Sequence, residues 1–240
     1  MLTKAQIKYI QSLGHKKLRE AEQVFVAEGP KLINEFLSAG NVKPAAIYAV
    51  ESFAATHPGK DINVITDTEL RRISSLPAPN EVVGIFGKPA FEQPSFEDSF
   101  TIMLDGIQDP GNLGSIIRSA DWFGVRTIVC SRDCADNFNS KVVQSTMGSL
   151  TRVQLIYTDL HLFINTTRLP SMYAATLNGE NLYNMKPVQQ GVLIIGNESK
   201  GISTELIERS NQQITIPRKG QAESLNAGVA TGIILSHLLT

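Results

Sequence analysis

The sequence predicts an α/β protein whose later part forms a mostly parallel sheet with helices on both faces. From about residue 100 onward, short β-branched runs alternate with helical stretches, which is the pattern of β-α-β units. The connecting helices of such units cover the two faces of the sheet. Hydrophobic residues make up 42% of the 240 residues and the formal net charge is -1, as in a folded globular chain.

The first part of the chain predicts a separate, smaller α/β module. Between this module and the parallel sheet, the segment Gly87 to Asp98 holds two prolines and shows little periodicity, which favours a linker. We therefore expect a domain boundary near residue 95, with domains at 1–95 and 96–240. In the module, strands are expected at 24–27, 46–50, 64–65 and 82–86, and helices at 30–39 and 67–74.

In the later domain, turn residues separate each strand from the next helix. After the first strand, Asp109-Pro110-Gly111 forms a turn, and Asn112 can cap the following helix by accepting a backbone N–H bond. Ligands in parallel sheets bind at the carboxyl ends of the strands, where these loops fall. The expected strands are 101–104, 127–131, 153–157, 172–177, 192–195 and 213–216, and the expected helices are 112–123, 140–147, 159–167 and 225–239.

The last expected helix, Leu225 to Leu239, is apolar on almost every side. Such a helix has to be buried, and at about fifteen residues it is short for a membrane span. Its small residues would let another backbone come close. Burial within the monomer and burial against a second subunit both remain open.

Composition also excludes several classes of protein. Only two cysteines occur, Cys130 and Cys134, and no second Cys/His pair completes a zinc site, so we expect no metal. The chain opens on polar sequence, and no run approaches the roughly 18 apolar residues of a membrane span. We therefore expect no membrane association and a cytoplasmic location. The spacings G-x-G-x-x-G and G-x-x-x-x-G-K-[ST] are absent, which disfavours an ordinary NAD or ATP site.

A local basic segment begins the chain. Five cationic residues, Lys4, Lys8, Lys16, Lys17 and Arg19, precede the first acidic one. Such an arm could follow an RNA phosphate backbone. The solvated face of a helix explains the same charges equally well.

Three segments of the later domain combine apolar runs with Gly, Asn, Glu and Ser. They are DGIQDPGNLGSIIRSADWFG from Asp105, GNESKG from Gly196 and IPRKGQAESLNAGVA from Ile216. In order and spacing they resemble the three motifs of the SpoU/TrmH family of RNA 2'-O-ribose methyltransferases, in the SPOUT superfamily. The N-terminal region, with FVAEGPKLINEFL, is similar to the ribosomal-protein-like substrate-binding domain that often precedes the catalytic domain.

The resemblance implies an S-adenosylmethionine cofactor held in a deep trefoil knot, which physical rules alone would not predict because knots are nearly absent among folds. A glycine there permits close approach, and the aliphatic residues can wall an adenine and a thioether arm. A plain turn also accounts for the glycines. The positions that match the family's cofactor contacts are Thr176, Leu177, Gly196, Asn197, Gly201, Ile216 and Leu225.

The resemblance also implies a set of catalytic positions: Asn112, Arg118, Glu198, Ser224 and Asn226. Because guanidinium stays protonated, we expect Arg118 to clamp a phosphate and stabilise the developing oxyanion rather than to accept a proton. Two ordinary structural roles remain open: an ion pair of Arg118 with Asp121 on the next turn, and a helix N-cap for Ser224.

The resemblance makes methylation of RNA on a ribose 2'-oxygen the expected function, with ribosomal RNA first and transfer RNA second. A non-catalytic RNA-binding paralogue is the third hypothesis, which the intact motif residues disfavour. The family works as a homodimer in which the final helix packs across subunits, and we expect the same here. Two residues depart from the family pattern: Arg218, where an apolar residue is usual, and Ser199, where Gly is frequent. Arg218 could add an RNA contact.

Overall fold

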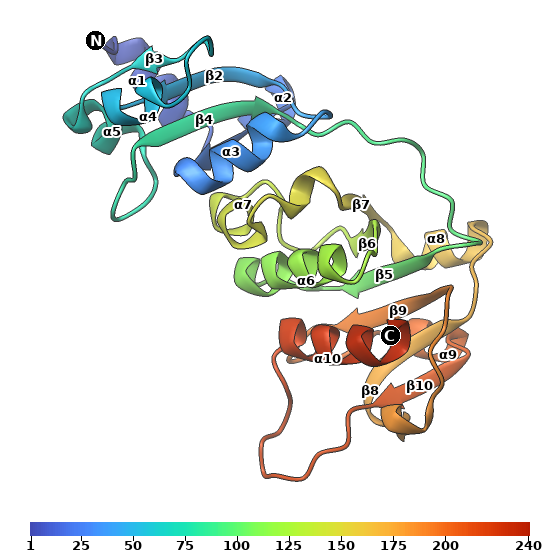
Figure 1. Cartoon of the computed structure of the whole chain (residues 1–240). Coiled ribbons are helices and arrows are strands. Elements are labelled where there is room, and N and C mark those ends of the chain that lie inside the picture. The colour runs from blue at the N-terminus through green and yellow to red at the C-terminus, as the bar shows by residue number, and fades with distance from the viewer. The chain divides into compact units, whose positions relative to one another are not determined.

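The computed structural model describes residues 1–240 and divides them into two compact units (Figure 1). Unit 1 comprises Met1–Phe91 and Phe138–Thr151, and unit 2 comprises Glu92–Asn137 and Arg152–Thr240. The expected boundary near residue 95 lies close to the start of unit 2. The segment 138–151, which we expected in the later domain, packs with unit 1 instead.

Unit 1 is built on a four-stranded sheet in the order β1-β4-β2-β3. β4 runs antiparallel to both β1 and β2, and β3 runs parallel to β2. The strands are β1 (Val24–Glu28), β2 (Pro44–Ala49), β3 (Asn63–Val64) and β4 (Val82–Gly87), close to the positions expected. The helices are α1 (Lys4–Ser12), α2 (Lys16–Glu22), α3 (Pro30–Ser38), α4 (Glu51–Ala55), α5 (Asp67–Ile73) and α7 (Ser140–Thr146), followed by the 3-10 turn η1 (Ser149–Thr151).

Aromatic rings form part of the core of unit 1 and explain why α7 belongs to it. The ring of Phe25 lies 5.0 Å from Phe36 and 5.8 Å from Phe86, centre to centre. Phe138, just before α7, brings its ring to 5.1 Å from Phe25. Aromatic pairs at such distances add to the stabilisation from burial. These contacts join the segment 138–151 to β1.

The basic N-terminal segment forms helices rather than an extended arm. α1 buries Ile7 and Ile10 and leaves Lys4 and Lys8 exposed. Arg19 on α2 is only 4% exposed, and its guanidinium donates to the carbonyl oxygens of Leu13 and Gly14 at 2.7 and 2.8 Å. Arg19 therefore stabilises the connection between the two helices, whereas the exposure of Lys4 and Lys8 fits both a solvated helix face and an RNA contact.

Unit 2 is a six-stranded sheet in the order β10-β8-β9-β5-β6-β7. Every neighbouring pair is parallel, which confirms the predicted parallel α/β class. The strands are β5 (Phe100–Asp105), β6 (Thr127–Ser131), β7 (Gln154–Thr158), β8 (Met172–Asn181), β9 (Gly191–Gly196) and β10 (Gln212–Thr215). The helices are α6 (Pro110–Trp122), α8 (Leu160–Thr166), α9 (Thr204–Arg209) and α10 (Ala227–Leu239), and the 3-10 turn η2 (Leu182–Asn184) follows β8.

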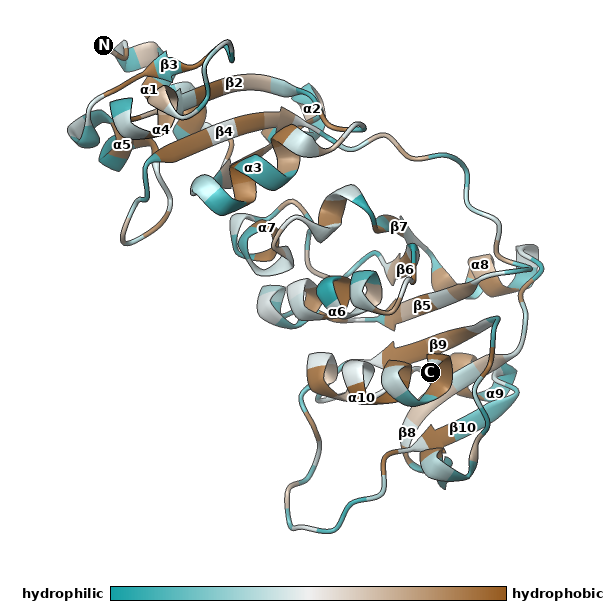
Figure 2. Cartoon of the chain, in the orientation of Figure 1, coloured by the Kyte–Doolittle hydropathy of each residue, from teal (hydrophilic) through white to brown (hydrophobic).

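Different helices cover the two faces of this sheet. Met103, Val129 and Ile194 face one way and pack in one cluster with residues of α8 and α9. α6 and α10 lie together over the opposite face (Figure 1). The central strands β5 and β9 are mostly apolar (Figure 2) and are buried at every position but the last, as expected for strands that are covered on both sides. The trefoil knot implied by the resemblance stays a prediction.

One face of α10 is buried within its own chain, against α6. A Cβ added at Gly228 would come within 2.9 Å of Ser115 Cβ, and one at Gly232 within 3.7 Å of Ser119 Oγ. α10 therefore lies close against α6 of the same chain. Its other side is partly open, because Val229 is 52% exposed. No helix combines the length and the apolar character that crossing a membrane requires.

Candidate active site at the carboxyl edge of the parallel sheet

Two of the three motif loops begin side by side. In the register of β5 and β9, the last pair is Asp105 with Gly196, and because the strands are parallel both loops leave from the same edge. The Asp105 carboxylate accepts the backbone N–H of Ser203 at 2.7 Å. This bond ties the end of β5 to Ser203, two residues after the second motif.

Asn112 is not the cap of its helix, contrary to the sequence prediction. Asp109 is the N-cap of α6 and accepts the backbone N–H of Asn112 at 2.8 Å. α6 therefore begins at Pro110, a residue suited to a first helical position. The Asn112 side chain is left to bond outward, and its amide donates to the carboxylate of Glu198.

Asn226 completes a chain of three polar side chains. Its amide nitrogen donates to the Asn112 side-chain oxygen at 2.6 Å, while its own oxygen accepts from the backbone N–H groups of Gly228 and Val229 at 3.0 and 3.3 Å. Residues from all three motifs thus meet in one network, although 114 positions separate Asn112 from Asn226. The same contacts make Asn226 the N-cap of α10.

The second motif is a tight loop. The backbones of Asn197 and Gly201 exchange hydrogen bonds at 3.0 and 2.8 Å. A Cβ on Gly196 would come within 2.3 Å of the Gly201 backbone, and Gly201 has a φ of +71°, so both positions favour glycine. The Asn197 side chain donates to the carbonyl of Gly106 at 2.7 Å and accepts the backbone N–H of Ser199 at 2.9 Å. These bonds assign Asn197 a loop-fixing role besides its expected place at the cofactor.

Thr176 and Leu177 lie in an irregular part of β8. Gln213 of β10 pairs with Ala174, but the next residue on β10 pairs with Glu180, so residues 175–179 have no partner there. Leu177 is 72% exposed. Its carbonyl accepts the hydroxyl of Thr215 at 3.3 Å, which places it beside the strand end that leads to Ile216.

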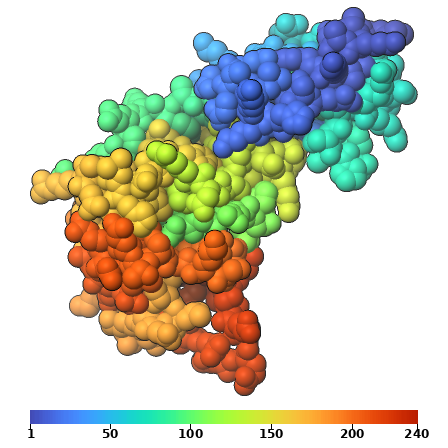
Figure 3. Space-filling view, turned by 180° about the vertical axis from the view of Figure 1, so that it is seen from behind, coloured from blue at the N-terminus to red at the C-terminus, as the bar shows by residue number.

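The third motif lies in residues 216–226, which connect β10 to α10. This connection has no regular secondary structure and projects from unit 2 (Figures 1 and 3). Leu225 is 45% exposed. Ser224 is exposed and makes no hydrogen bond within the chain, and because Asn226 is the cap, the alternative cap role of Ser224 is wrong. Arg218 donates to the Ala222 carbonyl at 3.2 Å, within the same loop.

Arg118 is an exposed residue of α6 with no hydrogen bond or ion pair in the chain. The alternative that it pairs with Asp121 is wrong, because Asp121 binds Arg152 through contacts of 2.9 and 3.0 Å. The Arg152 guanidinium engages both carboxylate oxygens of Asp121, the geometry of a strong ion pair. Arg118 is therefore left available for an external anion.

Some of the residues that shape this edge were not singled out from the sequence. Besides Asp105, Ser131 at the end of β6 accepts the backbone N–H of Gly106 at 2.9 Å and donates to Asp133 at 2.6 Å. Both are polar residues at the last position of a buried strand, which is the signal that could have found them.

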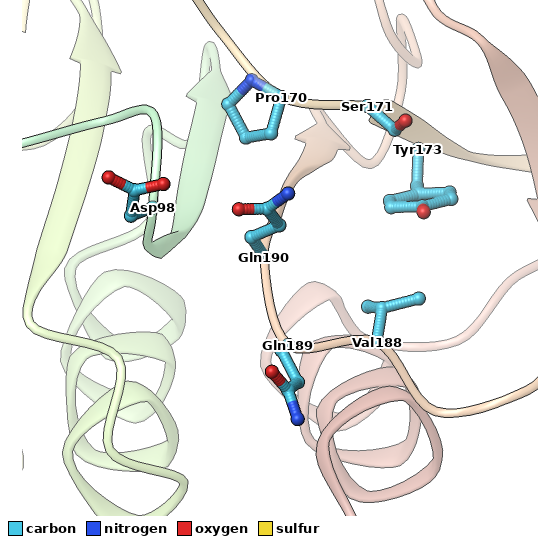
Figure 4. Close-up of a pocket in the computed structure, with 7 residues that line it drawn as sticks. All are labelled: Asp98, Pro170, Ser171, Tyr173, Val188, Gln189 and Gln190. Atoms are coloured by element: carbon cyan, nitrogen blue, oxygen red, sulfur yellow. The ribbon is translucent and has the colours of Figure 1, made fainter.

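One pocket of about 790 Å³ lies elsewhere, at the amino ends of the strands. Figure 4 shows Ser171 and Tyr173 at the start of β8 and Gln189 and Gln190 just before β9, with Asp98 nearby. None of the expected site residues lines it. Parallel α/β sheets bind ligands at the carboxyl edge, and the hydrogen-bonded motif residues lie there, so we place the site at that edge.

The fold and these loops define a class of protein: a parallel α/β domain whose three motif loops leave the carboxyl edge of its sheet, after β5, β9 and β10. The profile of the SpoU rRNA Methylase family matches residues 99–236, more than half of the chain. This chain belongs to that family. Residues 4–84 match the MRM3-like substrate binding domain.

Relatives and solved structures agree with this assignment. The 23S rRNA (guanosine(2553)-2'-O)-methyltransferase RlmP of Bacillus subtilis is 27% identical, over 97% of this chain and 95% of its own length. RlmB of Escherichia coli, a 23S rRNA (guanosine-2'-O-)-methyltransferase, is 32% identical over 59% of this chain and 60% of its own. The AdoMet-bound rRNA methyltransferase of Sinorhizobium meliloti is 31% identical with a TM-score of 0.84, covering 99% and 95% of the two chains.

Proposed function

We propose that this protein methylates ribosomal RNA on a ribose 2'-oxygen with S-adenosylmethionine as the methyl donor. The observation that carries the proposal is the hydrogen-bonded network of Asn112, Glu198 and Asn226. It unites all three motifs of a chain that belongs to the SpoU rRNA Methylase family. The same intact network disfavours a non-catalytic paralogue.

The residues at the carboxyl edge fit the cofactor. An adenine ring and a thioether arm need apolar walls. Leu177 is 72% exposed and Leu225 is 45% exposed, so both side chains can line a ligand. Together with Ile216 and Thr176, these residues would hold the adenosine. The tight loop of Gly196, Asn197 and Gly201 would face it with backbone groups. S-adenosylmethionine supplies a methyl group that its sulfonium activates for in-line transfer.

Catalysis by this chain rests on positioning and on local electrostatics. Arg118, exposed and without a partner in the chain, would bind the phosphate next to the reacting ribose and stabilise the negative charge that grows on the 2'-oxygen. The Glu198–Asn112–Asn226 network would hold polar groups in fixed directions around the nucleotide. The exposed Ser224 hydroxyl offers a further hydrogen bond to the substrate.

Ribosomal RNA is favoured over transfer RNA by the extent of the matches. The relative named for 23S rRNA matches nearly all of this chain.

The same proposal includes a homodimer and a cytoplasmic location. Trp122 at the end of α6 is 84% exposed and Val229 on α10 is 52% exposed, although aromatic and aliphatic side chains of this size favour burial. A second copy of the chain that covers these helices would bury them. Light scattering after gel filtration should give twice the monomer mass, and Trp122→Glu should shift it toward the monomer.

The experiment that tests the function is mass-spectrometric mapping of ribose methylation in RNA from cells with and without this protein. We expect one 2'-O-methylated nucleotide to disappear from ribosomal RNA and to return when the protein is restored. If a 2'-O-methylated nucleotide disappears from transfer RNA alone, transfer RNA replaces ribosomal RNA as the proposed substrate. An unchanged map in both RNAs would contradict it.

A further inference from the structure

The two cysteines of the chain lie together beneath the first motif's loop. Cys130, on β6, pairs with Leu104 of β5. The turn after β6 folds back through a hydrogen bond from the Cys134 backbone to Ser131, 3.2 Å long, so that the second thiol returns to the strand ends. Cys134 Sγ accepts the backbone N–H of Ile107 at 3.3 Å and donates to the Leu104 carbonyl at 3.4 Å.

This turn is also joined to the loop by its backbone. Ala135 donates to the Ile107 carbonyl at 2.8 Å, and Gly106 donates to the Ser131 hydroxyl. Residues 106 and 107 begin the first motif's loop, which ends at Asp109 and leads into α6, where Asn112 lies. A change in the hydrogen bonds of Cys134 therefore affects the start of this loop.

The two thiols differ in reactivity. Hydrogen bonds from Cys130, Ser131 and the Ile107 backbone lower the pKa of Cys134 to about 7, whereas burial raises the pKa of Cys130. The thiolate is the nucleophile in thiol oxidation. Cys134 is 6% exposed and Cys130 is fully buried, so Cys134 is the thiol that reagents in solution reach.

We propose that Cys130 and Cys134 form a peroxide-sensitive thiol pair whose conversion to a disulfide disturbs the first motif's loop, which leads into α6 and Asn112. The Cys134 thiolate attacks one oxygen of hydrogen peroxide, the O–O bond breaks and hydroxide leaves, which gives a sulfenic acid. The Cys130 thiol then loses its proton, its sulfur attacks Cys134 Sγ, and the S–O bond breaks with release of water. In total, two thiols and one peroxide give one disulfide and two waters.

The disulfide removes the thiol that donates to Leu104 and weakens the acceptor of the Ile107 N–H. Because both bonds end at the first motif's loop, the position of Asn112 and its bonds to Glu198 and Asn226 should change. Methyl transfer should therefore fall on oxidation and recover when a dithiol reduces the bond. The expected loss of methyl transfer rests on the proposed function, whereas the formation of the disulfide does not.

The test uses the full chain treated with hydrogen peroxide and then with N-ethylmaleimide. We expect the wild-type protein to lose two hydrogen atoms in mass and to bind no maleimide. Cys130→Ser should instead stop at a sulfenic acid on Cys134 that dimedone traps. Cys134→Ser should stay unmodified, because the remaining thiol is buried and protonated. Two thiols that remain free in the wild-type protein would overturn the proposal.

Activity provides a separate measurement. Peroxide should remove most methyl transfer from the wild-type protein, dithiothreitol should restore it, and peroxide should leave the methyl transfer rate of Cys134→Ser at the value measured for that variant before treatment. A disulfide that forms without a loss of methyl transfer would overturn the coupling to the loop. If the wild-type protein shows no methyl transfer before oxidation, the proposed function is contradicted. The change in mass on peroxide treatment still decides in that case whether the two thiols form a disulfide.

Discussion

At the scale of single residues, side-chain amides connect the parts of the site. Asn226 both caps α10 and donates to Asn112, and Asn197 both closes its own loop and donates to Gly106. An amide suits such positions because it carries a donor and an acceptor on one planar group. Each of these residues therefore has a structural task that can be separated experimentally from its part in the site.

Asn226→Asp separates the two tasks of Asn226. The carboxylate keeps the acceptor for the Gly228 and Val229 N–H groups, and its charge suits a helix N-terminus, but it cannot donate to Asn112. We expect the free energy of unfolding to change little while methyl transfer falls strongly. Asn226→Ala should lose the same activity and about 1 kcal/mol of stability as well. Equal loss of stability in both variants, measured by urea unfolding, would contradict this division.

Arg118→Ala should abolish most methyl transfer and leave cofactor binding nearly unchanged. Removing one group that stabilises a developing oxyanion costs about 10² to 10³ in rate, and Arg118 is exposed and makes no hydrogen bond or ion pair that its loss would disturb. Single-turnover kinetics and calorimetry with S-adenosylmethionine measure the two effects. Arg118→Lys, which keeps the charge but not the planar fork, should be intermediate. Unchanged turnover in Arg118→Ala would remove this residue from the site.

The lowered pKa of Cys134, about 7, predicts a pH dependence of its reactivity. Because the thiolate is the reactive form, the rate of alkylation should rise as the pH increases through about 7 and then level off. The Cys130 thiol, the Ser131 hydroxyl and the backbone N–H groups of Ile107 and Gly106 lower this pKa, and burial opposes them; Tyr157 is a further titratable group near the pair. Iodoacetamide labelling followed by peptide mass spectrometry measures the rate of alkylation. A rate that still climbs near pH 9, the range of an ordinary thiol, would disagree.

At the scale of elements, small residues determine how α10 lies on α6. Gly228 and Gly232 face Ser115 and Ser119, so the two helices can come close. This contact brings the start of α10, and hence Asn226, within reach of Asn112 on α6. The packing of two helices thus contributes to the geometry of the site.

A matched pair of substitutions tests this packing. The Cβ of Gly228→Ala would lie 2.9 Å from Ser115 Cβ, which is too close, whereas that of Gly232→Ala would make ordinary contact at 3.7 Å. We expect Gly228→Ala to destabilise the protein by about 1–3 kcal/mol. Gly232→Ala should be neutral or should stabilise it by up to about 1 kcal/mol, because alanine favours the helix interior. Thermal unfolding that ranks the two variants in the opposite order would contradict this packing.

The sequence predicted which strands form more accurately than it predicted the residues at which helices begin. Periodicity found nearly every strand of both sheets, but not helices α1, α2, α4 and α9, which are short or strongly polar. Asn112 and Asn226 were assigned to the site through the resemblance, yet the hydrogen bond from Asn226 to Asn112 forms only in the folded domain. The two cap assignments failed because several residues near each helix start can cap it, and only the backbone geometry selects Asp109 and Asn226.

At the scale of the whole molecule, the two units are not two consecutive stretches of sequence. The segment 138–151 leaves unit 2 between β6 and β7 and packs with unit 1. Its own pattern, a short helix after a strand, fits a β-α-β unit equally well, so periodicity could not reveal the exchange. The deciding contact, Phe138 with Phe25, joins residues far apart in the chain.

This exchange predicts the behaviour of a truncated chain. A fragment of residues 92–240 would lack the partners of 138–151, including the Phe25 ring and the Glu28 carbonyl that accepts from Gln144 at 2.9 Å. Limited proteolysis should therefore cut the fragment within 138–151, while the full chain resists cleavage there. S-adenosylmethionine binding should persist in the fragment. Equal protection of 138–151 in both chains would contradict the division into these two units.

The decisive measurement is the position of the methyl group in the product. Purified protein is incubated with methyl-labelled S-adenosylmethionine and unmethylated ribosomal RNA, and the nucleosides are separated after digestion. We expect the label on a ribose 2'-oxygen, and we expect it to vanish with Arg118→Ala. Label on a base, or no label from a protein that binds the cofactor and the RNA, would show that the three loops do not form the proposed site.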